Sequence, residues 1–123
     1  MFEILFYEDK NGNSELFNEL EQIAKLAPNN KNYRIQLKQI TFCIELLKAQ
    51  GLQLPTNIAK YLTEDVWELR PGNNRILYFY FKENKFVLLH MFKKKTKKTP
   101  QKEIDKAIRE INDYKNRFGG KQL

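Results

Sequence analysis

The chain has 123 residues, of which 41% are hydrophobic and 13% aromatic, and its formal net charge is +7. We interpret residues 1–123 as one folded domain, long enough to close a core without disulfides or metals. One cysteine and one histidine exclude an internal disulfide, a cysteine-based zinc cage and a multi-histidine metal site. We therefore expect no metal and no cofactor.

The net positive charge is confined to the second half of the chain. Residues 1–60 carry seven Lys or Arg and seven Asp or Glu, whereas residues 61–123 carry fifteen against eight. Such asymmetry indicates an anionic partner, either a nucleic acid or an acidic protein. The first residues lack the basic start and apolar run of a signal peptide, and no window approaches the ~18 apolar residues of a membrane span. These features favour a soluble, cytoplasmic protein with no membrane partner.

The first half of the sequence predicts a strand followed by two helices. Residues 2–7 are apolar and β-prone, which indicates a short strand. Ser14 is placed to cap a first helix, whose apolar residues recur at helical spacing. A longer second helix is predicted from about Lys31 to Gln50, and Gly51 would end it in the left-handed conformation. Two helices joined by so short a break should pack as an antiparallel hairpin.

The second half predicts three strands and a last helix, after a connector with one helical turn near residues 58–62. The strands are expected at residues 66–70, 75–81 and 86–92. Their short links imply sequential antiparallel pairing. Thr99 and Pro100 match an N-cap and first helical position, and Gly119-Gly120 would stop the helix. The order β-α-α-β-β-β-α is an α+β fold with a mainly antiparallel sheet, an N-terminal helical hairpin and a C-terminal helix.

Several short motifs follow one another between Leu52 and Ile111. They are Leu52-Gln53-Leu54-Pro55, Glu68-Leu69-Arg70, Arg75-Ile76-Leu77-Tyr78, Leu89-His90-Met91-Phe92, Lys94-Lys95-Thr96, and Thr99-Pro100 before a helix with Ile104 and Ala107. In this order and spacing the chain resembles the HigB branch of the RelE/ParE superfamily of bacterial toxins, over about half of its length. Residues 1–51 resemble that branch only in the type and order of their expected elements, a strand followed by a helical hairpin.

This resemblance implies a RelE-like fold and the toxin of a type II toxin–antitoxin system. Such a toxin enters the ribosomal A site and cleaves mRNA there, as a ribosome-dependent endoribonuclease or mRNA interferase that inhibits translation. The implied partners are the ribosome, mRNA and a small cognate antitoxin of the helix-turn-helix DNA-binding class. Two alternatives stay open: a toxin like those of the ParE side, which share this fold and inhibit DNA gyrase without cutting RNA, and a non-catalytic basic RNA-binding module.

The chemistry of metal-free RNA cleavage selects the candidate catalytic residues. Attack of the ribose 2′-OH on the adjacent phosphate needs a proton acceptor, cations around the pentacoordinate phosphate and a proton donor for the 5′ oxygen. Arg70 and Arg75 suit the second task, because the guanidinium fork matches two phosphate oxygens and stays charged. Lys94 and Lys95 begin just beyond the third strand and complete the cationic set. Glu68 shares a strand face with Arg70, and it would either act as general base or orient an arginine.

Candidate RNA-binding residues surround this set. The density of the lysine run favours contact with an anion over a solvated loop. Its RNA-binding members are expected to be Lys93, Lys97 and Lys98. Tyr78 and Tyr80 are candidates to stack on an exposed base, although alternating strand positions also suit packing. His90, the only imidazole, is either a functional group or a packed residue of an apolar strand.

Overall fold

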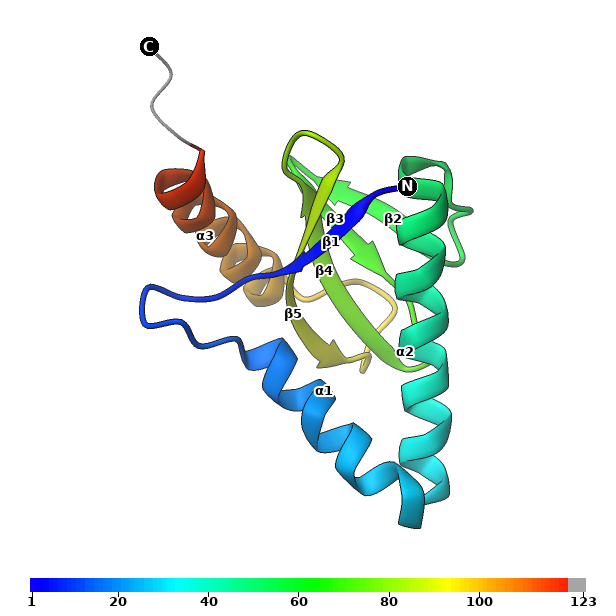
Figure 1. Ribbon diagram of the computed structural model, residues 1–123. Coiled ribbons are helices and arrows are strands. Elements are labelled where there is room, and N and C mark those ends of the chain that lie inside the picture. Colours follow the sequence, from blue (N-terminus) through cyan, green and yellow to red (C-terminus); the bar gives the residue numbers. More distant parts are fainter. Residues whose placement is uncertain (120–123) are drawn as a thin grey trace.

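The computed structural model describes residues 1–119, which form one mixed sheet with helices on both faces (Figure 1). In chain order the elements are β1 (Glu3–Phe6), α1 (Glu15–Leu26), the 3-10 turn η1 (Ala27–Asn29), α2 (Lys31–Gln50), the 3-10 turn η2 (Gly51–Gln53), β2 (Ala59–Thr63), β3 (Val66–Leu69), β4 (Asn74–Tyr80), β5 (Lys85–Lys93) and α3 (Gln101–Phe118). The strand order is β1-β5-β4-β3-β2, with β1 parallel to β5 and the other pairs antiparallel. The expected α+β architecture is confirmed, with one strand more than the sequence predicts.

The additional strand is β2, and the prediction of a connector with a helical turn near residues 58–62 is wrong. Residues 59–63 pair with β3, with Ala59 opposite Leu69 and Tyr61 opposite Trp67. The Tyr61 and Trp67 rings meet edge to face at a centroid separation of 5.4 Å, a cross-strand contact that stabilises such a pair. Because β2 is an edge strand with an exposed tyrosine, its sequence lacks the apolar alternation by which a half-buried strand is recognised.

The central strands have both of their faces covered. Leu69, Ile76 and Leu88 pack toward α1 and α2, whereas Leu77 and Phe79 belong to a second core beneath α3. Figure 1 shows α3 and α2 on opposite sides of the sheet. Burial on both faces explains why β4 and β5 read as nearly continuous apolar runs.

The helical hairpin begins and ends where the sequence indicates. The Ser14 hydroxyl accepts the Phe17 amide at 3.1 Å and caps α1. Gly51 ends α2 with φ at 61°, and a Cβ at this position would overlap the Phe2 ring. Its ψ of −125° lies outside the left-handed helical region, in a conformation open only to glycine. The two helices meet at η1 and splay apart toward the sheet, so the hairpin is a V and not a close-packed pair (Figure 1).

The start of α3 departs from the expected cap. Pro100 is the N-cap residue, and no side chain caps the helix. The Thr99 hydroxyl donates instead to the Glu68 carboxylate on β3, so a tertiary hydrogen bond has replaced the local one. Gly119 follows α3 as expected, and Gly120 lies outside the described residues.

Within residues 1–119, none of the helices is both long and apolar enough to cross a membrane.

Candidate anion-binding site at the end of the sheet

The predicted catalytic residues converge at one end of the sheet. The end of β3, the start of β4 and the end of β5 lie side by side there, because β3, β4 and β5 form an antiparallel meander. The loop of residues 94–100 leaves β5 at this point and leads into α3. The Lys94 amide donates to the Asn73 carbonyl at 2.7 Å, which fastens the loop to the β3–β4 turn.

Glu68 is the buried centre of the site, with 2% of its surface exposed. Its Oε1 accepts from Arg70 Nε at 3.0 Å and lies 3.9 Å from Arg75 Nε. Its Oε2 accepts from the Thr99 hydroxyl. Both oxygens are therefore engaged, and the geometry favours the orienting role over that of a general base.

Arg75 is held by backbone carbonyls as well as by Glu68. Its Nη1 donates to the Gly72 and Asn74 carbonyls, each at 2.8 Å. Burial lowers the pKa of Arg75 from its ordinary value, while the Glu68 carboxylate opposes the shift and Arg70 adds to it. A guanidinium nevertheless stays charged at neutral pH. Within residues 1–119, its Nη2 has no hydrogen-bond acceptor, so this nitrogen is available to an outside anion.

The lysine loop closes over Arg75. A small pocket is lined by Glu68, Arg75, Phe92 and residues 94–100. In the described part of the chain, no carboxylate lies within ion-pair distance of Lys94, Lys95, Lys97 or Lys98. One carboxylate thus faces two guanidiniums and four ammonium groups, and the site has an excess of positive charge. Lys93 differs from the others, because its Nζ donates at 2.7 Å to Gln36 on α2, on the opposite face of the sheet.

His90 lies near the site but is closed off from it. Only 2% of its surface is exposed. Its Nδ1 lies 2.6 Å from Glu110 Oε1, and its Nε2 lies 3.0 Å from Glu103 Oε1. Both ring nitrogens are therefore engaged by α3, and the expectation that His90 contacts RNA is corrected: it fastens β5 to α3.

The two tyrosines of β4 lie away from the site as well. Tyr78 is buried with 1% exposure between Trp67 and Phe86, and burial raises its pKa. Its expected stacking on a base is therefore wrong, since no face of the ring is open. Tyr80 is exposed, but it is the last residue of β4 whereas Arg75 is the second, and its hydroxyl accepts from the Asn84 amide at 3.1 Å.

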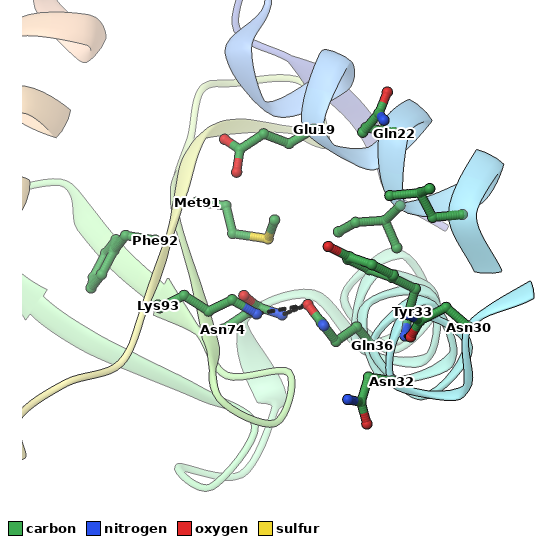
Figure 2. Close-up of a pocket in the computed structure, with 12 residues that line it drawn as sticks. Glu19, Gln22, Asn30, Asn32, Tyr33, Gln36, Asn74, Met91, Phe92 and Lys93 are labelled. Carbon is green, nitrogen blue, oxygen red and sulfur yellow. Dashed lines mark hydrogen bonds between the residues drawn. The ribbon is translucent and has the colours of Figure 1, made fainter.

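A second hollow, which the sequence does not predict, lies between the two arms of the helical V. This interhelical cleft has a volume of about 560 Å³. Figure 2 shows Glu19 and Gln22 of α1 on one side of the cleft, Tyr33 and Gln36 of α2 on the other, and Met91 of β5 lining it as well. Because these side chains come from separate elements, no local sequence motif predicts the cleft.

The site and the fold can now be compared with known proteins. The family model for phage-derived Gp49-like proteins (DUF891) matches residues 18–112. The chain belongs to this Gp49-like family. The match reaches from α1 into α3, and it therefore includes both arginines and the whole lysine loop. A comparison with curated proteins gives no match.

Solved structures share the fold of this Gp49-like protein. The YoeB–YefM complex from Staphylococcus aureus is 15% identical with a TM-score of 0.51, covering 78% of this chain and 99% of that one. The YoeB dimer from the same organism is 14% identical with a TM-score of 0.50, covering 77% and 97%. A heterotetrameric YoeB–YefM toxin–antitoxin complex, also from Staphylococcus aureus, is 14% identical with a TM-score of 0.51, covering 78% and 98%. At this identity the likeness shows the fold alone, and it confirms the expected RelE-like architecture. Assignment to the HigB branch stays a prediction.

Proposed function

We propose that this Gp49-like protein is the toxin of a toxin–antitoxin system and that it cleaves mRNA on the ribosome without a metal ion. The observation that carries the proposal is the cationic site, in which buried Glu68 orients Arg70 and Arg75 beside four lysines that have no ion-pair partner within residues 1–119. The family match and the fold shared with YoeB, a protein solved within a toxin–antitoxin complex, support the same reading. The HigB-like motifs of the sequence make a ribosome-dependent endoribonuclease the preferred activity.

The arginines would stabilise the transition state. When the ribose 2′ oxygen bonds to phosphorus and the P–O5′ bond breaks, negative charge develops on the phosphate oxygens. Donors that are already fixed in place stabilise such charge without reorganising, which is the largest single contribution in many enzymes. Arg75 meets this requirement because two carbonyls and Glu68 fix its guanidinium, while Nη2 has no acceptor among residues 1–119.

The lysines would supply the remaining charge and the proton transfer. Glu68 has both oxygens engaged and His90 has both nitrogens engaged, so neither is placed to take the 2′-OH proton. Lys94, Lys95, Lys97 and Lys98 all line the pocket beside Arg75, and we assign the proton exchange to Lys94 and Lys95, which directly follow β5. Lys97 and Lys98 would bind RNA backbone as counter-charges. The products would be a 2′,3′-cyclic phosphate and a 5′-hydroxyl.

The proposed setting follows from this substrate. The protein would act in the cytoplasm, where ribosomes and mRNA are found, and a cognate antitoxin, predicted to be of the helix-turn-helix class, would silence it. An unsilenced nuclease of this kind would arrest growth. The antitoxin is therefore required for the gene to be maintained.

The decisive experiment is induction of the chain in cells without its antitoxin, with RNA 5′ ends mapped before and after. We expect growth arrest with new 5′-hydroxyl ends inside translated codons, and cleavage by the purified chain only when ribosomes are present. Arg75→Ala should lower the single-turnover rate by about 10²–10³-fold, the usual loss for one well-aimed donor. Arg109→Ala, which removes an exposed arginine of α3 outside the site, should cleave normally.

Two outcomes would contradict the proposal. Arrest with a DNA-damage response and intact mRNA would indicate a gyrase inhibitor. Ribosome binding without any cleavage would indicate an RNA-binding module. A soluble, fully active Arg75→Ala protein would remove this residue from the mechanism.

A further inference from the structure

The interhelical cleft shares a wall with the cationic site. Asn74 and Arg75 are consecutive residues of β4, and their side chains therefore point to opposite faces of the sheet. Arg75 lines the cationic pocket, whereas Asn74 lines the cleft. Phe92 lines both hollows, and in Figure 2 its ring points away from the residues of α2. The two hollows are thus separated only by the end of the sheet.

The lysine run crosses this dividing edge. Lys93 lies in the cleft, where its Nζ donates to Gln36, and Lys94 lies in the cationic pocket. A polyanion bound along these two consecutive lysines would therefore pass from one hollow into the other. Since a phosphate, its sugar and its base form one unit, a backbone held at Arg75 and Lys94 can deliver a neighbouring base to the cleft.

The lining of the cleft suits an uncharged ring with polar edges. Five of its twelve lining residues are Asn or Gln, one is acidic and one is basic. Carboxamides offer both a donor and an acceptor, as base edges do. Tyr33 adds an aromatic ring, the side chain on which unpaired RNA bases stack. The volume of about 560 Å³ is within the range of small-ligand sites.

Gln36 is the most informative residue of this lining. Its Oε1 accepts from Lys93 Nζ at 2.7 Å and from Asn74 Nδ2 at 3.1 Å (Figure 2). Because an ammonium group only donates, this pair fixes which end of the amide faces Lys93. The Nε2 group is the other end, and within residues 1–119 it has no acceptor. A fixed donor without a partner is what a specificity-determining contact requires.

We propose that the interhelical cleft binds a nucleobase of the RNA whose phosphate is held at Arg75, and that the Gln36 amide donates to the edge of this base. This inference rests on the proposed function for its substrate class. It adds a specificity site on the face of the sheet opposite the chemistry. Cleavage would then depend on the identity of a base next to the cut.

The test uses the purified, isotope-labelled chain, with NMR titrations of inorganic phosphate and of the four nucleoside 5′-monophosphates. Phosphate should shift only the resonances of the cationic site, at Arg75 and residues 94–98. Nucleotides should shift these and also Tyr33, Gln36 and Asn74 in the cleft, to an extent that depends on the base. If nucleotides shift the same resonances as phosphate, the proposal that the cleft binds a base is wrong, while anion binding at the cationic site still stands. If phosphate itself shifts nothing at Arg75, the proposed function fails, and this inference fails with it.

A matched pair of variants tests the role of the Gln36 Nε2 group as a hydrogen-bond donor. Gln36→Glu keeps the oxygen that accepts from Lys93 and Asn74, but it replaces the free donor by an acceptor. It should weaken the best-bound nucleotide by about tenfold, with phosphate binding unchanged, and it should alter the base preference of cleavage on ribosomes. Gln50→Glu adds the same charge at the exposed far end of α2, outside the cleft, and should leave base preference unchanged. Equal effects of the two variants, or a cleft that responds to the antitoxin and to none of the nucleotides, would sink the idea.

Discussion

Two buried charge clusters lie between the sheet and α3, and they are built in opposite proportions. Around Glu68, one carboxylate lies beside two guanidiniums, next to a loop whose lysines 94, 95, 97 and 98 have no ion-pair partner in the described part of the chain. Around His90, one imidazole lies between the carboxylates of Glu103 and Glu110, with 2% of the histidine exposed. The first cluster has more positive charge than its own carboxylate can neutralise, whereas the second has every polar atom of its histidine engaged. The two clusters therefore differ in the ratio of basic to acidic groups, with two guanidiniums to one carboxylate around Glu68 and one imidazole to two carboxylates around His90.

The two clusters depend on each other through the loop of residues 94–100. His90 is near the end of β5, before this loop, and Glu103 is in the first turn of α3, after it. Their hydrogen bond therefore fixes the distance that the loop must span. At the loop's far end, Thr99 bonds to Glu68. The contact between His90 and Glu103 therefore helps to place the lysine loop beside the Glu68 cluster.

The largest loss of stability is expected from Glu68→Gln, which removes the single carboxylate from the cationic cluster. Arg70 and Arg75 would then repel each other without compensation, and neither can lose its proton. We expect the free energy of unfolding to fall by about 3 kcal/mol, as for a buried charge pair that loses one partner. Denaturant unfolding measures this loss.

The same variant separates the two roles considered for Glu68. If Glu68 orients the arginines, the rate of the folded protein should fall while the pH dependence of cleavage keeps its shape. If Glu68 were the general base, the acidic limb of the pH–rate profile would disappear. Single-turnover rates on ribosomes across the pH range decide between them.

A smaller effect is expected at the closed cluster, from His90→Leu. This change leaves Glu103 and Glu110 without their shared partner, and each carboxylate loses one hydrogen bond. We therefore expect a loss of about 2 kcal/mol in the free energy of unfolding. The single-turnover rate of the folded fraction should change much less than in Arg75→Ala. A His90→Leu protein of normal stability that has lost cleavage would make the histidine a chemical group and would erase the distinction between the clusters.

Much of the fold could be predicted because local signals agreed with the tertiary structure. The second helix runs from Lys31 to Gln50 as expected, between the Asn30 side chain that caps it and Gly51. Most ends of the three central strands lie one residue away from the expected position. The edge strand β2 was missed because its contacts come from a neighbouring strand and leave no local pattern.

The cationic site was predictable for a similar reason. Residues at the end of one strand, the start of the next and the end of a third must meet in an antiparallel meander. Burial was not predictable in the same way: alternation says that successive residues of a strand point to opposite faces of the sheet, but not that helices cover both faces. The cleft joins Gln36 to Lys93 across 57 positions of sequence, a pairing that only the splayed helices bring about.

The smallest expected effect concerns the exposed lysines of the cationic cluster. The double variant Lys97→Gln with Lys98→Gln tests whether these lysines contact RNA. Both lysines are exposed and have no ion-pair partner within residues 1–119, so fold and stability should not change. If they bind RNA phosphates, each releases counterions on binding, and the slope of log affinity against log salt should fall by about 1.4 for two lost contacts with single-stranded RNA. Ribosome binding measured between low and physiological salt gives this slope. The control is Lys10→Gln with Lys25→Gln, which removes the same charge from exposed positions in the neutral first half. A salt slope that falls equally in both double variants would mean that the protein is attracted by its overall charge, and that the lysine loop has no contact of its own with RNA.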